Sequence, residues 1–423
     1  MGNHAPKPPP EALKAAHVPA GVLEVLERLR RAGHEAYLVG GCVRDLLDFR
    51  VPGDWDVATQ AVPVEVQGLF RKVIPTGIAH GTVTVLLSGA KVEVTTYRVE
   101  TGYADGRRPD HVEFRRDLVE DLARRDFTIN AMAFDPTSGE FRDPFAGLQD
   151  LARRTVRSVG DAAARFGEDG LRPLRAVRFA TVLDFELDAL TEAAIPGALP
   201  VFRKVAPERV RDEFLKLLLA PAVERGLRLL DTTGLLGAVF PELETAVRAG
   251  AGAAVAAVPP RLDVRLAALL FSAQAPEAVL ERLRLPSRTV EEVRALLAHP
   301  LPEDASAWND VAMRRWAARL GAERVPDALE LATARGLPSA VSLRTNVERV
   351  LASHPPLTVR ELALDGRGMM DVLGVGPSPV VGEATRWLLE QVLEVPERNT
   401  ESTLRERLRA WAEARGLKPG APG

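Results

Sequence analysis

Residues 36–59 read AYLVGGCVRDLLDFRVPGDWDVAT, and this stretch decides the fold of the N-terminal part of the chain. The apolar run that ends at Val39 predicts a buried strand, which Gly40 and Gly41 stop before a short helix over CVRDLLDF. After the turn VPGD, the segment WDVAT predicts a second strand. A strand, a glycine turn, a helix and another strand in close succession predict an α/β domain.

The same mixed pattern extends from about residue 22 to 145. A helix over VLEVLERLRRAG, which ends in Gly33, precedes the first strand, and TVTVLLSGAKVEVTTYR predicts a hairpin that turns at SGAK. The run ETGYADGRRPDHVEF is rich in charge and turn formers, so we expect a mobile loop there. From RRDFTINAMAF onward the sequence predicts helices almost throughout. The expected fold class is therefore an α/β head followed by a long all-α part.

Composition limits the possible classes of protein. The 423 residues suffice for about three domains, and no apolar run reaches the ~20 residues that span a bilayer. The N-terminus has prolines where a signal peptide needs an apolar segment, so we expect a cytoplasmic protein without a membrane partner. A single cysteine, Cys42, excludes an internal disulfide framework. Because the net charge is −3, any RNA must be held by local patches rather than by bulk positive charge.

The glycine turn is the first candidate site. Gly40 and Gly41, between a strand and a helix, would let a phosphate approach backbone N–H groups. Arg44, three residues into the helix, would add a guanidinium to the same anion. A simple tight turn is the alternative interpretation.

A pair of aspartates follows the turn. Asp54 and Asp56 are two residues apart on a predicted strand, so both side chains leave one face while Trp55 points to the other. Converging carboxylates repel each other unless a cation lies between them, and hard oxygen ligands suit Mg²⁺ that carries a triphosphate. Glu93, in the strand KVEVTTYR, would supply the third carboxylate that a two-metal site requires. A polar strand end and an exposed, salt-bridged glutamate are the alternatives.

The segment ARRDFTINAMAF carries the second group of candidates. We expect Arg124 and Arg125 at a helix start, with Asp126 and Asn130 one helical turn apart. The arginine pair would grip a phosphate while Asp126 accepts a hydrogen bond from a ribose hydroxyl. Helix capping by Asp126 is the competing interpretation.

The segment GEDGLRPLRAVRF carries the third group. Arg172, Arg175 and Arg178 step along one side of a predicted helix, and Asp169 lies three residues before Arg172. Such a row of arginines indicates bound anions, although ion pairs with Glu168 and Asp169 also explain it. Cytosine and adenine both present an amino donor beside a ring nitrogen acceptor, whereas guanine and uracil do not. Asp169 and Arg172 together would therefore accept C and A and reject G and U.

Seven segments, in this order, closely resemble the successive motifs of the bacterial class II tRNA nucleotidyltransferase and poly(A) polymerase family. They are YLVGGCVRDLL, DWDVAT, VEVTTYR, RRDFTINAMAF, DPFAGLQDL, GEDGLRPLRAVRF and PERVRDEFLKLL. The match spans roughly residues 35–245. The resemblance implies an α/β nucleotidyltransferase head followed by an all-α neck, body and tail, which we expect at residues 1–155, 156–222, 223–310 and 311–423. It also implies that tRNA runs along the helical part.

The resemblance further implies an activity and roles for residues. The chain would add CMP and AMP to the 3′ end of tRNA from CTP and ATP, with Mg²⁺ as cofactor and no obligate protein partner. Asp54 and Asp56 would bind the metals and, with Glu93, form the catalytic set. Asp169 and Arg172 would act as an amino-acid template. The full nucleotide-binding set would be Gly40, Gly41, Arg44, Arg125, Asp126, Asn130, Asp169, Arg172, Arg175 and Arg178.

Several activities compete within this family. Poly(A) polymerases typically carry an Arg-rich segment where this chain has PTGIAHGT, and they tend to have a longer basic C-terminal extension. Enzymes that add only CC tend to have a shortened loop, whereas ETGYADGRRPDHVEF looks full length, which favours complete CCA addition. An enzyme that adds only A keeps the same loop and stays an alternative. No His-Asp dipeptide occurs in the chain, so we expect no HD phosphohydrolase domain.

Two other classes of protein share part of the pattern. A catalytically silent tRNA-binding protein would have no use for the converging carboxylates Asp54 and Asp56. A nucleotidyltransferase that modifies small molecules would share them, but it would not need the EDGLR helix or a long helical body.

Overall fold

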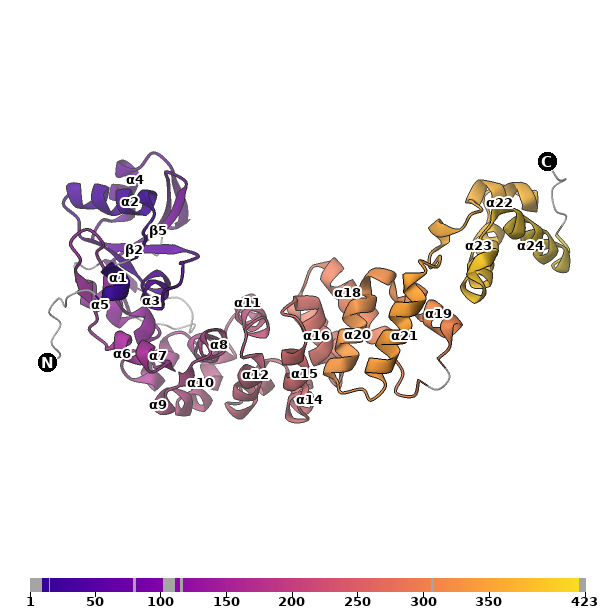
Figure 1. Ribbon diagram of the computed structural model, residues 1–423. Helices are drawn as coiled ribbons and strands as arrows, with labels where there is room; N and C mark the ends of the chain where they lie inside the picture. Colours follow the sequence, from indigo (N-terminus) through magenta and orange to yellow (C-terminus); the bar gives the residue numbers. More distant parts are fainter. Residues whose placement is uncertain are drawn as a thin grey trace. The chain divides into compact units, whose positions relative to one another are not determined.

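The protein is represented by a computed structural model, shown in Figure 1, which describes residues 10–14, 16–78, 81–101, 111–114, 117–305 and 308–417. The chain divides into two compact units, Met1–Gly252 and Ala253–Gly423. The division lies within the predicted body, 223–310. The finer partition into neck, body and tail stays a prediction.

Unit 1 begins with a seven-stranded mixed sheet in the order β3-β4-β5-β2-β1-β8-β9. Its strands are β1 (Ala36–Val39), β2 (Trp55–Thr59), β3 (Val73–Gly77), β4 (Thr82–Leu87), β5 (Ala90–Thr96), β8 (Ala133–Phe134) and β9 (Phe141–Arg142). β2 and β5 run parallel, and the other neighbouring strands run antiparallel. The predicted hairpin over β4 and β5 and the predicted strand over WDVAT are confirmed.

Two helices cover one face of this sheet. Figure 1 shows α2 (Ala20–Arg31) and α4 (Pro63–Leu69) on one side of it and α3 (Gly41–Leu47) on the other. α2 packs against β4 and β5, where a Cβ on Gly21 would lie 2.5 Å from the carbonyl oxygen of Leu87. In β5, Val92 and Val94 are buried, whereas Glu93 between them is exposed. Because strand side chains alternate, Glu93 lies on the face opposite α2.

The second half of unit 1 is mainly helical. α8 (Arg172–Leu183) packs against α11 (Pro207–Leu218) and α12 (Val223–Thr232). The other elements here include α5 (Leu118–Ala123), η2 (Thr128–Asn130), α6 (Gly147–Ala152), α7 (Ala162–Glu168), α9 (Ala189–Ala193), α10 (Ile195–Phe202), α13 (Leu235–Val239) and α14 (Glu244–Arg248). A two-residue parallel pair, β10 (Thr155–Val156) with β11 (Glu186–Leu187), is a small exception to the expected all-α neck.

The predicted mobile loop begins and ends in two short strands. β6 (Arg98–Thr101) and β7 (His111–Phe114) form an antiparallel pair. The middle of the loop, residues 102–110, lies outside the described residues, so its mobility stays a prediction.

Unit 2 consists of helices throughout its described residues. Its α-helices of eight or more residues are α16 (Leu262–Leu270), α17 (Pro276–Leu283), α18 (Ser287–Ala298), α19 (Asp310–Leu320), α20 (Val325–Ala334), α21 (Ala340–Ala352), α22 (Gly366–Leu373), α23 (Pro379–Glu394) and α24 (Glu401–Ala414). A buried cluster that includes Leu388, Leu404 and Leu408 joins α22, α23 and α24. Arg314 of α19 donates to the carbonyl oxygens of Leu393 (2.7 Å) and Glu394 (2.9 Å), which ties the end of α23 to α19. No helix among the described residues is long and apolar enough to cross a bilayer.

Candidate active site

The glycine turn brings three functional groups together. Gly40 follows β1 with φ 76° and ψ −137°, a backbone conformation that side chains other than glycine rarely adopt. A Cβ at this position would lie 3.0 Å from Nη1 of Arg125 and 3.4 Å from Oδ2 of Asp56. Glycine is therefore required here both by its φ angle and by the close approach of an arginine and a carboxylate.

The three predicted carboxylates lie around the start of β2. Asp56 and Glu93 are direct neighbours in the parallel register of these strands, so their side chains leave the same face of the sheet. Asp54 is exposed and precedes β2 by one residue, which corrects the expectation that it lies on the strand. Trp55 is buried, as expected for the opposite face.

Asp56 is partly buried among charges of both signs. The pKa of its carboxyl is raised to about 6, mainly by burial and also by the negative charges of Glu93 and Asp54, although Arg125 and Arg44 act to lower it. Asp54 and Glu93 thus lie close enough to act on Asp56 electrostatically. A site in which carboxylates repel one another favours a bound cation.

Asp54 and Asp56 fit a metal ion that binds together with a nucleotide. Among the described residues, no group of three or more His, Cys, Asp or Glu side chains is arranged to hold a metal ion. Mg²⁺ in nucleotide sites characteristically uses one or two carboxylates, with phosphate oxygens and waters completing its coordination. Asp54 and Asp56 supply donors of this kind beside the glycine turn. Their role as metal ligands stays a prediction.

The arginine pair Arg124 and Arg125 lies at the end of a helix, not at its start. α5 ends at Ala123, and Arg124 is its C-terminal cap, which corrects the predicted position. Both arginines bind the buried carboxylate of Asp121, through Nε of Arg124 (3.0 Å) and Nη2 of Arg125 (3.4 Å). Burial raises the pKa of Asp121, but the two arginines outweigh it and the net pKa is lowered. Asp121 therefore stays charged and holds Arg125 beside Gly40.

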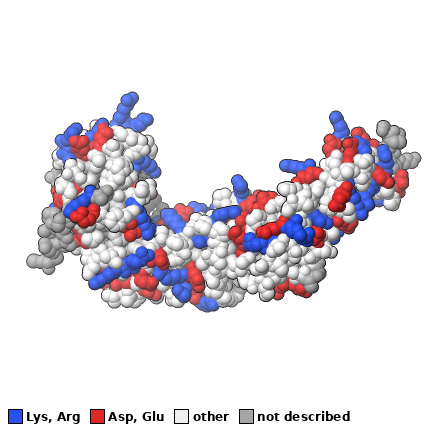
Figure 2. Space-filling model, viewed as in Figure 1, with Lys and Arg blue, Asp and Glu red and all other residues white. Residues whose placement is uncertain are grey.

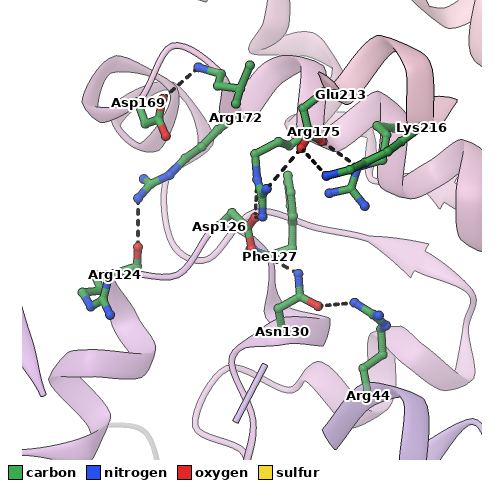
Figure 3. Close-up of polar contacts among 12 residues, drawn as sticks. Arg44, Arg124, Asp126, Phe127, Asn130, Asp169, Arg172, Arg175, Glu213 and Lys216 are labelled. Carbon is green, nitrogen blue, oxygen red and sulfur yellow. Dashed lines mark hydrogen bonds and ion pairs between the residues drawn. The ribbon is translucent and has the colours of Figure 1, made fainter. Parts of the chain in front are cut away.

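A continuous row of polar contacts joins the head to α8, as Figure 3 shows. Nη1 of Arg44 donates to Oδ1 of Asn130 (2.6 Å), and Nδ2 of Asn130 donates to Oδ1 of Asp126 (3.2 Å). Oδ2 of Asp126 accepts from Nε (2.9 Å) and Nη2 (2.6 Å) of Arg175. Burial raises the pKa of Asp126, but Arg175 and Asn130 bring it down to about 2. The row links residues that we predict to bind nucleotide.

The local structure around Asp126 differs from the expected helix. Asp126 and Asn130 are not one α-helical turn apart, because only the short 3₁₀ helix η2 forms, over Thr128–Asn130. Phe127 occupies the position before η2, so Asp126 is not its N-cap. Asp126 and Asn130 are nevertheless in contact, because the side chain of Asn130 donates a hydrogen bond to Asp126.

Asp169 and Arg172, the predicted template pair, lie in neighbouring elements. Asp169 is the C-terminal cap of α7 and Arg172 begins α8, so Asp169 lies outside the helix that carries the three arginines. Asp169 is paired with Arg209 of α11, at 3.0 Å and 3.3 Å. Nη1 of Arg172 donates to Glu168 (2.6 Å), and its Nη2 donates to the carbonyl oxygen of Arg124 (2.9 Å). Each member of the pair thus has a protein partner of its own (Figure 3).

The other two arginines of α8 meet protein carboxylates. Nε of Arg178 donates to Oε2 of Glu213 (2.7 Å), and Nη1 of Arg175 lies 3.6 Å from Oε1 of the same glutamate. The guanidinium of Arg178 also lies 3.5 Å from the ring centre of Phe179. Arg178 is only 9% exposed, so little of its side chain is accessible to a bound anion. Its contacts are those of a side chain that anchors α8.

Sequence reasoning missed several partners of the predicted residues. Asp121, Arg209 and Glu213 hold Arg125, Asp169 and the α8 arginines, yet none of the three was a candidate. Arg209 and Glu213 both lie in PERVRDEFLKLL, so the motif itself was the available signal. The helical pattern of that segment did not predict which residues Arg209 and Glu213 would contact.

The chain is similar to known families and proteins. Residues 36–157 match a family model described as "Poly A polymerase head domain", and residues 184–247 match "Probable RNA and SrmB- binding site of polymerase A". The CCA-adding enzyme of Lactobacillus johnsonii is 50% identical over 226 residues, which are 53% of this chain and 55% of that protein. The chain is thus aligned with only about half the length of that relative.

Other relatives match over nearly their whole length. The CCA-adding enzyme of Lactobacillus delbrueckii subsp. bulgaricus is 39% identical over 393 residues, 91% of this chain and 96% of that protein. The crystal structure of the Bacillus stearothermophilus CCA-adding enzyme in complex with CTP is 34% identical, with a TM-score of 0.78 and coverage of 94% of this chain and 98% of that one. The resemblance read from the motifs is confirmed, and the chain belongs to the class II CCA-adding enzymes, a family of tRNA nucleotidyltransferases.

Proposed function

We propose that the chain adds CMP and AMP to the 3′ end of tRNA, from CTP and ATP, without a nucleic-acid template and with release of pyrophosphate. The observation that carries the proposal is the register of Asp56 with Glu93 beside a turn at Gly40 that Arg125 closely approaches. It is supported by a relative named CCA-adding enzyme and by a similar structure of a CCA-adding enzyme in complex with CTP.

The carboxylates would hold the metals and the basic groups would hold the triphosphate. When bound, two divalent ions such as Mg²⁺ supply acidification of the attacking 3′-hydroxyl and neutralisation of charge on the triphosphate. Asp54 and Asp56 would bind them, and Glu93 would add a third negative charge on the same face. Arg125, fixed by Asp121, would face the phosphates that approach Gly40.

Selection of the base would require Asp169 and Arg172 to bind the base while they keep their present protein partners. Asp169 would accept from the amino group of cytosine or adenine, and Arg172 would donate to the ring nitrogen. Arg209 and Glu168, which now occupy these groups, would hold the two side chains in orientation. Preorganisation of this kind lowers the cost of binding. Arg175 and Asp126 would line the pocket, and Arg178 would support α8.

The test is a set of primer-extension reactions with purified protein. One tRNA lacks the terminal trinucleotide and another ends in CC, and each is incubated with CTP or ATP separately. We expect two nucleotides to be added to the first tRNA from CTP and one nucleotide to be added to the second tRNA from ATP. Addition of A alone would indicate an A-adding enzyme, long A tails would indicate a poly(A) polymerase, and no product would contradict catalysis.

A further inference from the structure

A second basic surface lies in unit 1, outside the site described above. A groove of about 810 Å³ runs along the end of the β4–β5 hairpin, beside α2 and the segment between α4 and β3. Its polar lining includes Arg28, Arg71, Lys72 and Lys91, and no aspartate or glutamate of the described ranges lines it. On the face shown in Figure 2, basic and acidic side chains are interspersed over most of the surface, so a groove lined by one sign of charge is a distinct feature.

Three of the four cations have no charged partner within the part of the chain that the structure describes. Arg28 is neutralised by Glu24, which also accepts a hydrogen bond from Ser88 at 3.1 Å. Arg71, Lys72 and Lys91 are exposed, and none of the described residues forms an ion pair with them. An open groove with uncompensated positive charges favours a polyanion as occupant.

Two residues of the groove lining, Lys91 and Leu86, lie on the strand face that carries the catalytic candidate Glu93. Lys91 precedes Glu93 by two residues on β5, so both side chains leave the same face, about 7 Å apart along the strand. Leu86 of β4 is paired with Lys91 and is partly exposed on that face. One basic and one apolar side chain of the groove thus lie on the same strand face as Glu93, with Lys91 two residues away from it.

The order of the strands indicates which reactant would approach from this side. Gly40 and Arg125 lie beside β1, whereas the groove lies at β4 and β5, and β2 with Asp56 stands between them. In phosphoryl transfer the attacking and leaving oxygens are roughly in line. If the triphosphate lies at the Gly40 turn, the attacking strand has to reach the carboxylates from the opposite side, across β5.

We propose that this groove binds backbone phosphates of the single-stranded 3′ end of tRNA and leads the terminal hydroxyl to Glu93. The inference rests on the proposed function, because it takes the polymerisation site to lie at Asp56 and Glu93. Proteins that bind single-stranded RNA hold its backbone in positively charged grooves of this kind.

The experiment compares two charge reversals of equal size. Arg71→Glu combined with Lys72→Glu changes the groove, and Arg203→Glu combined with Lys204→Glu changes another exposed basic pair of unit 1 by the same charge. We expect the groove variant to raise KM for tRNA ending in CC about tenfold, with KM for ATP and the melting temperature unchanged. Lys91→Gln should act in the same direction. The dependence of log(kcat/KM) on log salt should weaken by about 0.7 for each phosphate that a variant no longer binds.

The outcomes separate this inference from the proposed function. An inactive wild-type protein contradicts the proposed function. An active wild type with unchanged KM for tRNA in the groove variants contradicts the groove alone. An equal effect of the control pair shows that only bulk charge matters, and a change confined to KM for ATP shows that the groove holds triphosphate; both results overturn the inference.

Discussion

The carboxylate of Asp169 is held by the guanidinium of Arg209, whose Nη2 lies 3.0 Å from Oδ2 of the aspartate. Arg209 belongs to α11, and Asp169 is the C-terminal cap of α7. The residue that we propose to read the amino group of the incoming base is therefore oriented by an arginine from another helix. This ion pair limits the directions in which Asp169 can accept a hydrogen bond.

Arg209→Ala is expected to blur the choice among nucleotides. Without Arg209, Asp169 loses its orienting partner, and the discrimination of CTP and ATP against UTP and GTP should fall about tenfold, as for loss of one good base contact. The measurement is kcat/KM for each of the four triphosphates. Asp169→Ala should give the same pattern, and a variant that merely binds all triphosphates more weakly would contradict an orienting role.

Asp54→Ala and Asp56→Asn are expected to abolish incorporation without loss of stability. Asp54 is exposed, and burial with neighbouring negative charge makes the charged form of Asp56 unfavourable, so removal of that charge should leave the melting temperature of the metal-free protein equal or higher. Product formation is measured on tRNA ending in CC, and thermal unfolding is measured with a chelator present. Retained activity would refute the metal assignment.

Gly40→Ala separates a steric effect from backbone strain. The new Cβ would meet Nη1 of Arg125 at 3.0 Å and would also strain a residue with φ 76°. Gly33→Ala is the matched control, since Gly33 has φ 89° and nothing within 4 Å of the added atom. Gly33→Ala should lose about 1 kcal/mol of unfolding free energy and Gly40→Ala at least as much. Only Gly40→Ala should lose most of its kcat, and equal activities would show that Arg125 does not need this position.

The stability contributed by Asp126 should depend on pH. Its pKa is lowered from 3.8 to about 2 in the folded protein, so the unfolded chain binds the proton more readily. The contribution, about 2 kcal/mol, is complete above pH 4 and is lost as pH falls from about 4 to 2. Urea unfolding of the wild type and of Asp126→Asn at pH 7, 3.5 and 2.5 measures it. If the difference in unfolding free energy between the wild type and Asp126→Asn does not shrink at low pH, the contribution does not come from the lowered pKa of Asp126.

Glu213→Gln is expected to destabilise unit 1 by about 3 kcal/mol, because it leaves Arg178 buried without a charged partner. Glu186→Gln is the control, since Glu186 pairs with Arg225 at 2.6 Å but its side chain is 76% exposed. Loss of an exposed pair should cost less than about 1 kcal/mol. Urea unfolding of both variants tests this, and equal values would show that Glu213 does not anchor α8.

Patterns within short segments were sufficient for much of this protein. Alternation in KVEVTTYR predicted that Glu93 would leave the face opposite Val92 and Val94, and the burial of these residues confirms it. The glycines after Val39 predicted the turn, and seven ordered motifs predicted the family. These features depend on residues close in the chain, where helix and strand periods act directly on side-chain direction.

The partners of the charged residues were decided only by the tertiary structure. Arg44 meets Asn130 across 86 positions, Arg175 meets Asp126 across 49, and Arg178 meets Glu213 across 35. A row of arginines at helical spacing indicates that anions are present but not whether protein or ligand supplies them. Likewise, the local pattern predicted a helix that starts at Arg124 and Arg125. In the structure α5 ends before Arg124, and only the short η2 follows. Ion pairs between distant segments form only after strands and helices have packed, because their geometry depends on the relative positions of whole elements.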